Sequence, residues 1–322
     1  MGRIDVEGPD QVAFLQHVLS SNVLALDLNQ AQYCIIPDAN GYAIDDAYLY
    51  RFEEGKYFLV INAGNIDKDW AHLMNEAKNF DVKLTNVSDK YAAIAVQGPE
   101  SKKILMTLSG GRQLTPENVK NALNSLTMEG KPVRIAKTGY TGEPIGYELY
   151  CNSEDARYFW DRLIELGAKP TALGARDTTR MEAALPLYGH EMGECEMGGE
   201  IQIYAVPLAK FAVSFDEAKG DFIGREPLKK QFEALKKIMN RDYSSIEDLP
   251  YRIQPIYLEG KGVLRKGFPI YCKDAWAEGK QIGYVTSGTM IPYYKTEGQG
   301  LESVFTDETG KRSIGLAYMD SR

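Results

Sequence analysis

The sequence has few of the residues that build disulfides and metal sites. Its 322 residues include four cysteines and three histidines. The histidines are dispersed, and no Cys-x-x-Cys pair exists, because the cysteines stand at Cys34, Cys151, Cys195 and Cys272. Neither a disulfide framework nor a zinc site is therefore predicted, and we expect no metal. A reducing cytoplasm is the compartment that fits this use of cysteine.

A long apolar run and an excess of basic residues are also missing. No stretch approaches the roughly 20 apolar residues of a transmembrane helix, and the N-terminus has no signal-peptide core. Lysine and arginine together number 37 against 45 aspartates and glutamates, a formal net charge of −8. That balance argues against a general nucleic-acid or anionic-membrane surface. We expect neither nucleic acid nor a membrane as a partner, although a small anion could bind in a local basic pocket.

What the sequence does contain is typical of a globular protein of mixed structure. Hydrophobic residues make up 44% and charged residues 25%, and the length allows two or three domains. Hairpins alternate with helices: Asp38-Ala-Asn-Gly is a turn signal, and the returning strand runs over 43–52. Repeated βαβ units are not found, so the fold class is predicted to be α+β.

One helical stretch, residues 172–192, places the acid Glu182 among small and apolar residues. Glu182 is preceded by Arg176 and Arg180. An acid flanked by aliphatic residues is poorly solvated, and to stay buried it needs a hydrogen-bonding ligand or an arginine. The alternative interpretation is an amphipathic helix with a solvated pair between Asp177 and Arg180.

Four further segments extend this pattern along the chain. They are Ala43-Ile-Asp-Asp46 after Asn40-Gly41, Thr138-Gly-Tyr-Thr-Gly-Glu143 with Gly146-Tyr-Glu148, Asp221-Phe-Ile-Gly-Arg225, and Gly283-Tyr-Val-Thr-Ser-Gly-Thr289. With residues 172–192 they give five ordered matches, by which the chain resembles the aminomethyltransferase family, the T-protein of the glycine cleavage system. The resemblance implies an enzyme that releases ammonia from the aminomethyl-dihydrolipoyl H-protein and forms 5,10-methylenetetrahydrofolate. Tetrahydrofolate would be a co-substrate and the lipoylated H-protein the partner.

The resemblance also implies a domain plan. Residues 1–225 would form a folate-binding catalytic region of two subdomains, about 1–100 and 101–225. Residues 226–249 would be a helix and linker. Short strands separated by turns, over 253–258, 269–271, 281–287 and 313–318, predict that residues 250–322 form a small C-terminal antiparallel β-barrel. Family members carry an N-terminal segment and a last C-terminal strand that we expect to be missing here, with a loss of stability. We expect a monomer.

Asp45 and Asp46 are the candidates for catalysis. Neighbours on a strand point to opposite faces, so the two acids are not expected to share one proton. The pattern alone does not say which of them faces a ligand. The resemblance implies that Asp46 is catalytic, accepting a hydrogen bond from the folate nitrogen that attacks the methylene carbon.

The resemblance further assigns four residues to the folate pocket. Glu182 would accept hydrogen bonds from the pterin 2-amino and ring N–H groups, because a carboxylate offers two acceptors to two neighbouring donors. Tyr33 and Asn62 would line the pocket. Tyr140 is either a pocket wall or an anchor of its glycine-rich turn. Lys219 is the nearest candidate for the basic residue that the family places before the Phe-Ile-Gly element.

Two other functions stay open at this level. A tetrahydrofolate-dependent demethylase could use the same scaffold with a different donor, because fold does not fix function. A folate-binding protein without transfer activity, like the related iron–sulfur assembly factors, is the other. Those factors carry a Lys-Gly-Cys-Tyr motif that this sequence does not contain, and the presence of Asp46 favours catalysis.

Overall fold

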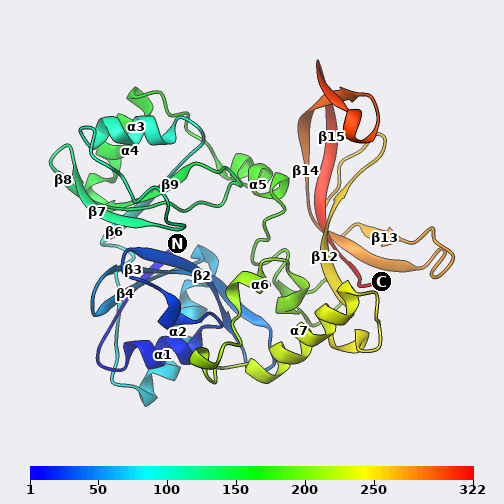
Figure 1. Cartoon of the computed structure of the whole chain (residues 1–322), viewed down its shortest axis with the longest axis horizontal. Helices are drawn as coiled ribbons and strands as arrows, with labels where there is room; N and C mark the ends of the chain where they lie inside the picture. Colours follow the sequence, from blue (N-terminus) through cyan, green and yellow to red (C-terminus); the bar gives the residue numbers. More distant parts are fainter. The chain divides into compact units, whose positions relative to one another are not determined.

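The computed structural model describes residues 1–322, and packing divides them into two compact units. Unit 1 contains Met1–Thr171 and Leu208–Lys230, and unit 2 contains Ala172–Pro207 and Gln231–Arg322. Sheets and helices occur together in both, as Figure 1 shows, so the predicted α+β class is confirmed. None of the helices is long and apolar enough to cross a membrane.

The first sheet of unit 1 is antiparallel and has five strands in the order β2-β3-β4-β1-β5. Its elements are β1 (Gly2–Glu7), β2 (Gln30–Pro37), β3 (Ala43–Glu53), β4 (Lys56–Ile61) and β5 (Lys83–Asn86), with α1 (Gln11–Val18) and α2 (Ile66–Glu76). Both helices cover one face of this sheet (Figure 1). Phe14, Leu15 and Val18 of α1 are fully buried against Leu49 and Leu59 of the strands.

The second sheet of unit 1 has four antiparallel strands in the order β6-β9-β8-β7. They are β6 (Tyr91–Gln97), β7 (Leu123–Met128), β8 (Lys131–Ala136) and β9 (Gly146–Asn152), covered by α3 (Ser101–Leu108) and α4 (Ala156–Glu165). The sequence did not predict β7, because its polar residues Asn124, Ser125 and Thr127 fall on both faces and break the alternation.

The two sheets of unit 1 pack face to face through an aromatic core. Tyr50 and Phe58 of the first sheet meet Tyr150 of the second, and the rings of Phe58 and Tyr150 lie 5.3 Å apart at 80°. The Tyr150 hydroxyl donates to that of Tyr50 at 3.0 Å. Because Tyr50 belongs to β3, strand alternation places Asp46 on this same inter-sheet face and Asp45 on the helix-covered face.

Unit 2 is built on an antiparallel sheet in the order β12-β15-β14-β13. Its elements are α5 (Leu173–Glu182), β10 (Gly193–Glu194), β11 (Glu200–Ile201), β12 (Tyr251–Tyr257), β13 (Pro269–Tyr271), β14 (Gln281–Glu297) and β15 (Val304–Asp320). The sheet is consistent with the predicted barrel-like C-terminal domain. In unit 1, α6 (Ala209–Ala212) follows, and α7 (Arg225–Met239) begins there and ends in unit 2.

The last two strands are longer than predicted. The sequence indicated strands over 281–287 and 313–318, with a connection between them, whereas β14 and β15 form one hairpin of 17 residues in each strand. Its outer half is mostly exposed on both faces, so apolar alternation does not reveal it, and Pro292 argues against a strand there. Short 3-10 turns connect other elements: η1 (Val23–Ala25), η2 (Ala63–Asn65), η3 (Ala77–Asn79), η4 (Ser153–Asp155), η5 (Ile203–Ala205), η6 (Glu217–Lys219), η7 (Ile246–Asp248) and η8 (Gly300–Glu302).

Candidate functional site

The Asp46 carboxyl is held by two donors on the inter-sheet face of unit 1. Its Oδ2 accepts a hydrogen bond from the Tyr33 hydroxyl at 2.9 Å, and its Oδ1 accepts one from Asn62 Nδ2 at 2.7 Å. Tyr33 pairs with Tyr48 across β2 and β3, so its ring reaches Asp46 diagonally. Asn62 follows β4, whose last residue pairs with the neighbour of Asp46. Three predicted site residues therefore meet at one carboxyl.

Burial gives this carboxyl an unusual titration. Loss of water, reinforced by the charge of Asp45, raises the pKa of Asp46 to about 6, although the donors Tyr33 and Asn62 oppose the rise. Burial raises the pKa of Tyr33 well above its ordinary value, so the phenol remains a donor. An acid that titrates near neutral pH can accept and return a proton at working pH. The arrangement is therefore suited to proton transfer or to stabilising positive charge beside Asp46.

Asp45 turns away from this face and supports Asn62. The carboxyl is fully buried and accepts from Asn62 N at 3.0 Å, Asn62 Nδ2 at 2.9 Å and Asn65 Nδ2 at 2.7 Å. The strand alternation expected for the two acids is observed. Because the Asn62 amide donates to both Asp45 and Asp46, its amino side is fixed toward the acids and its Oδ1 away from them.

The glycine-rich loop after β8 is shaped by one buried amide. Gln97 Nε2 donates to the carbonyls of Thr138 at 3.2 Å and Tyr147 at 3.0 Å. A Cβ at Gly139 or Gly146 would lie 1.9 or 2.2 Å from Gln97 Oε1, so a side chain at either position would displace the Gln97 amide. This loop carries Tyr140, which is close enough to Tyr33 to raise the pKa of that phenol through its charge.

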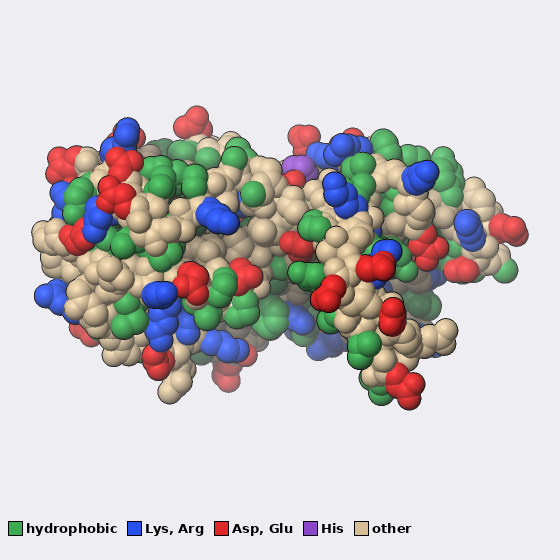
Figure 2. Space-filling view, turned by 90° about the horizontal axis from the view of Figure 1, so that it is seen from above, with side chains coloured by type: hydrophobic (Ala, Val, Ile, Leu, Met, Phe, Trp, Pro, Cys, Tyr) green, Lys and Arg blue, Asp and Glu red, His purple; other side chains and the backbone are tan.

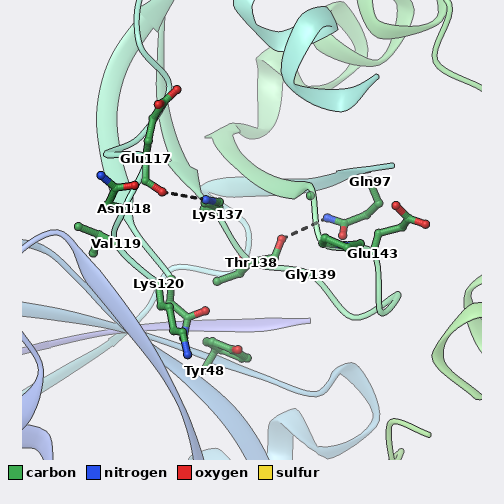
Figure 3. Close-up of a pocket in the computed structure, with 13 residues that line it drawn as sticks. Tyr48, Gln97, Glu117, Asn118, Val119, Lys120, Lys137, Thr138, Gly139 and Glu143 are labelled. Atoms are coloured by element: carbon green, nitrogen blue, oxygen red, sulfur yellow. Dashed lines mark hydrogen bonds between the residues drawn. The ribbon is translucent and has the colours of Figure 1, made fainter. Parts of the chain in front are cut away.

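A polar cavity of about 420 Å³ adjoins the Asp46 cluster (Figure 3). Tyr48 lines it, and the Tyr48 ring centre lies 5.7 Å from that of Tyr33. The other lining residues come from the second sheet and its loops: Gln97, Glu117, Asn118, Val119, Lys120, Asn121, Lys137, Thr138, Gly139, Glu143, Pro144 and Gly146. The cavity thus extends from the aromatic neighbours of Asp46 along the glycine-rich loop.

Glu182 belongs to unit 2 and is the last residue of α5, where its side chain is exposed. The prediction of a poorly solvated acid is wrong within this unit, because the buried charge on α5 is Arg180, which is 1% exposed. Arg180 pairs with buried Glu191 at 2.8 Å and with Asp177 at 2.7 Å, and it donates to Ser287 Oγ at 2.8 Å. The alternative of a fully solvated Asp177–Arg180 pair is wrong for the same reason.

Lys219, the predicted basic candidate, serves the fold of unit 1. It is 2% exposed, and its ammonium donates to the carbonyls of Gln16 and Leu19. Burial lowers the pKa of Lys219 to about 7. In this structure it is directed at backbone oxygens.

Comparison with known proteins identifies the family. The family described as GCVT N-terminal domain matches residues 1–204. An aminomethyltransferase of Caldanaerobacter subterraneus subsp. tengcongensis is 36% identical over 326 residues, covering 100% of this chain and 75% of the relative. One from Alkaliphilus metalliredigens is 33% identical over 327 residues, covering 100% of this chain and 77% of that relative. The chain belongs to the aminomethyltransferase family.

Membership of the aminomethyltransferase family confirms the predicted enzyme class, a one-carbon transferase. It also favours aminomethyl transfer over the demethylase and the non-catalytic folate-binding protein. The fold agrees: the crystal structure of glycine cleavage system aminomethyltransferase T from Bartonella henselae matches with a TM-score of 0.71 at 24% identity, covering 99% of this chain and 76% of that one.

Sequence reasoning missed several residues around the Asp46 cluster. Asn65 and Asp69 reach Asp45 from the start of α2, and Gln97 fixes the glycine-rich loop. A signal existed for the first two: Asn62, Asn65 and Asp69 follow a strand at intervals of three and four, which places them on one helix face. No local pattern marks Gln97, whose partners lie 41 and 50 residues further along the chain.

Proposed function

We propose that this aminomethyltransferase takes the aminomethyl group from the dihydrolipoyl arm of an H-protein, releases ammonia and forms 5,10-methylenetetrahydrofolate. The supporting observation is the buried Asp46 carboxyl, which titrates near pH 6 and is held by Tyr33 and Asn62. Tetrahydrofolate supplies the nucleophilic nitrogen. The protein supplies position and electrostatics, and these are the terms that an enzyme without covalent catalysis relies on.

Asp46 would act as the hydrogen-bond acceptor for the attacking amine. Each Asp46 oxygen takes one donor from the protein and keeps a further lone pair for a ligand N–H. An acceptor at that point raises the nucleophilicity of the amine and stabilises positive charge as the new bond forms. The fixed Tyr33 and Asn62 donors hold the carboxyl in one orientation while this happens.

The remaining folate contacts are assigned to four residues. Tyr33 and Asn62, which donate to the Asp46 carboxyl, would form walls of the pocket, and Tyr140, whose charge acts on Tyr33, would extend them. Glu182 would accept from the pterin amino and ring N–H groups as a bidentate acceptor. Its exposed carboxylate at the end of α5 has both oxygens available for such donors. The monomeric state and the cytoplasmic location stay predictions.

The Asp46→Asn variant tests the catalytic assignment. We expect turnover to fall about 100-fold or more, in the range of a lost acid–base group, while tetrahydrofolate affinity changes little. The assay follows ammonia release from aminomethylated H-protein, and Asp67→Asn, an exposed position on α2, serves as the control. Wild-type turnover in Asp46→Asn would reject the proposal. If Asp45→Asn lost more turnover than Asp46→Asn, the catalytic acid would lie on the opposite face of β3 from the one proposed.

The Glu182→Gln variant tests the folate assignment. Replacing one acceptor by a donor removes a charged hydrogen bond worth about 1.5–3 kcal/mol, so calorimetry should show an affinity loss of roughly 10- to 100-fold. Glu194→Gln, at another exposed position of unit 2, should bind as the wild type does. Equal affinity in the two variants would remove Glu182 from the site.

A further inference from the structure

Asp69 on α2 is a buried acid without a conventional partner. The residue is 0% exposed, and neither carboxyl oxygen meets an N–H or O–H donor. No ion pair involves Asp69, and the same holds for Asp45 and Asp46. Lys68, its neighbour on α2, donates to the carbonyl of Ile44, and its charge lowers the pKa of Asp69. An ionised carboxylate in such a place would be uncompensated, which costs several kcal/mol or more.

Asn65, four residues before Asp69 and therefore on the same side of α2, donates to Asp45 Oδ1 at 2.7 Å, so Asp69 faces Asp45. Burial and then a hydrogen bond with Asp45 raise the pKa of the Asp69 carboxyl. Asp45 already accepts three hydrogen bonds, from Asn62 N, Asn62 Nδ2 and Asn65 Nδ2, and each of them favours its charged form. Two carboxylates in contact in a desolvated site do not both ionise, because their repulsion is not screened. One proton converts the repulsion into a strong O–H···O⁻ bond. The proton belongs on Asp69, since Asp45 has the donors.

We propose that Asp69 is protonated at neutral pH, donates its O–H to the Asp45 carboxylate, and thereby acts as a positioning residue for Asp46 through Asn62. The second part rests on the proposed function of Asp46. In this arrangement Asp45 accepts hydrogen bonds from Asp69 and from Asn62, and the Asn62 amide also donates to Asp46. A fixed, ionised Asp45 holds the Asn62 amide, and the amide holds Asp46 Oδ1.

The charges around Asp69 agree with this assignment. Burial and then Asp45 raise the pKa of Asp69 to about 9, Lys68 opposes the rise, and Asp46 adds to it. With Asp69 neutral, the cluster holds at most two negative charges. The lower charge also limits the upward shift of the Asp46 pKa, so Asp46 can remain ionised at working pH.

A charge measurement tests the proton on Asp69 without reference to activity. Asp69→Asn should leave the native electrophoretic mobility at pH 7 unchanged, because a neutral carboxyl is replaced by a neutral amide. Asp67→Asn, an exposed acid two residues away on the same helix, should shift it by one charge. An equal shift in both variants would overturn the proposal. If Asp69→Asn does not fold, ¹³C-carboxyl resonances of the wild type decide, since one aspartate should remain protonated at pH 7.

Turnover tests the positioning role. Asp69→Leu removes the donor and keeps the branched shape of the side chain, whereas Asp69→Asn keeps a neutral donor toward Asp45. We expect kcat of Asp69→Asn to exceed that of Asp69→Leu by roughly tenfold or more, because a displaced catalytic group loses rate steeply. KM for tetrahydrofolate should change little, and the acid limb of the pH profile should move only in Asp69→Leu. Equal kcat in the two variants would overturn the role, whereas full activity of Asp46→Asn would instead reject the proposed function.

Discussion

At the scale of single residues, the site is a set of buried acids whose protonation is controlled by donors. Asp46 accepts hydrogen bonds from Tyr33 and Asn62, and Asp45 accepts them from two asparagines. Asp69 has no such donor and faces only another acid. Removing a donor should therefore change a titration before it changes the fold. That expectation gives two predictions.

Tyr33→Phe should move the acid limb of the pH–rate profile to higher pH. The Tyr33 hydroxyl favours the charged form of Asp46, so its loss raises the pKa of Asp46 above its value of about 6. A charged hydrogen bond of about 1.5 kcal/mol corresponds to a shift of about one pH unit. Steady-state rates from pH 5 to 9 measure it, with Tyr158→Phe on α4 as the control. A limb that stays in place, or moves to lower pH, would contradict the assignment.

The stability of the wild type should depend on pH through Asp69. A folded-state pKa of about 9 lies above the unfolded value near 4, so the folded state holds the proton more tightly. Its contribution is complete below about pH 4 and is lost as the pH rises toward 9, by at most about 1.4 kcal/mol per unit. Lys219, whose pKa is lowered to about 7, affects stability in the opposite direction: its contribution to the free energy of unfolding rises as the pH increases above 7. The difference in the free energy of unfolding between Asp69→Asn and the wild type therefore isolates the contribution of Asp69, because Lys219 is the same in both.

Urea midpoints at pH 5, 7 and 9 measure that difference. The midpoint of Asp69→Asn should rise relative to that of the wild type at each increase in pH, because the asparagine has no proton to lose. A constant difference across this range would show that Asp69 titrates as an ordinary surface acid.

At the scale of elements, the loop between β8 and β9 depends on two glycines that make room for Gln97. Gly146→Ala should destabilise unit 1 by about 1–3 kcal/mol, the usual cost of overpacking, because the new Cβ displaces the Gln97 amide from Thr138 and Tyr147. Thermal unfolding measures the change. Gly64→Ala is the control, since its Cβ meets nothing within 4 Å. In the double variant with Gln97→Ala, part of the loss should be recovered, because the clash is gone.

The end of α5 depends on a second buried contact, the pair between Arg180 and Glu191. Glu191→Ala should cost unit 2 about 3–5 kcal/mol, as expected when one partner of a buried pair is removed. Arg180 would keep Asp177, but Asp177 is 43% exposed and cannot replace a partner that is 0% exposed. Urea unfolding compares this variant with Glu194→Ala, an exposed position. Equal midpoints would show that the pair adds no stability.

At the scale of the whole molecule, charge is mixed over the surface, and Figure 2 shows acidic and basic side chains interspersed on the face that it presents. The predicted boundaries of the folate-binding region, 1–225, the linker, 226–249, and the C-terminal domain, 250–322, stay predictions. The compact units are divided by packing, which groups residues 172–207 with the C-terminal sheet. Sequence order hides such a grouping, because the partners of α5 lie more than 100 residues away.

The tip of the β14–β15 hairpin should affect solution behaviour more than stability. Leu301 and Phe305 are 107% and 80% exposed. Replacing both by serine should change the free energy of unfolding by less than about 0.5 kcal/mol each, while self-association decreases because exposed apolar edges are removed. Light scattering and thermal unfolding measure the two effects. A large loss of stability would show that the tip is packed in solution.

The sequence by itself determined several early elements and the fact that Asp45 and Asp46 face opposite sides of their strand. Periodicity and turn residues place β1, α1 and the β2–β3 hairpin, and the two-residue period of a strand separates Asp45 from Asp46. Local sequence rules are sufficient for these features, because strand periodicity and turn formation depend on residues that are neighbours along the chain. The family resemblance rests on motifs that can be read in the same way.

Only the tertiary structure decided what each charged group meets. Arg180, not Glu182, is the buried charge of α5, because the chain turns back after α5 to bring Glu191 to it and Ser287 reaches it from 107 residues away. Asn62 joins Asp45 to Asp46, and Asp69 reaches Asp45 from another element. The length of β14 and β15 was decided in the same way, by pairing between strands. Burial and pairing are properties of non-local neighbours, and a pattern along the chain does not contain them.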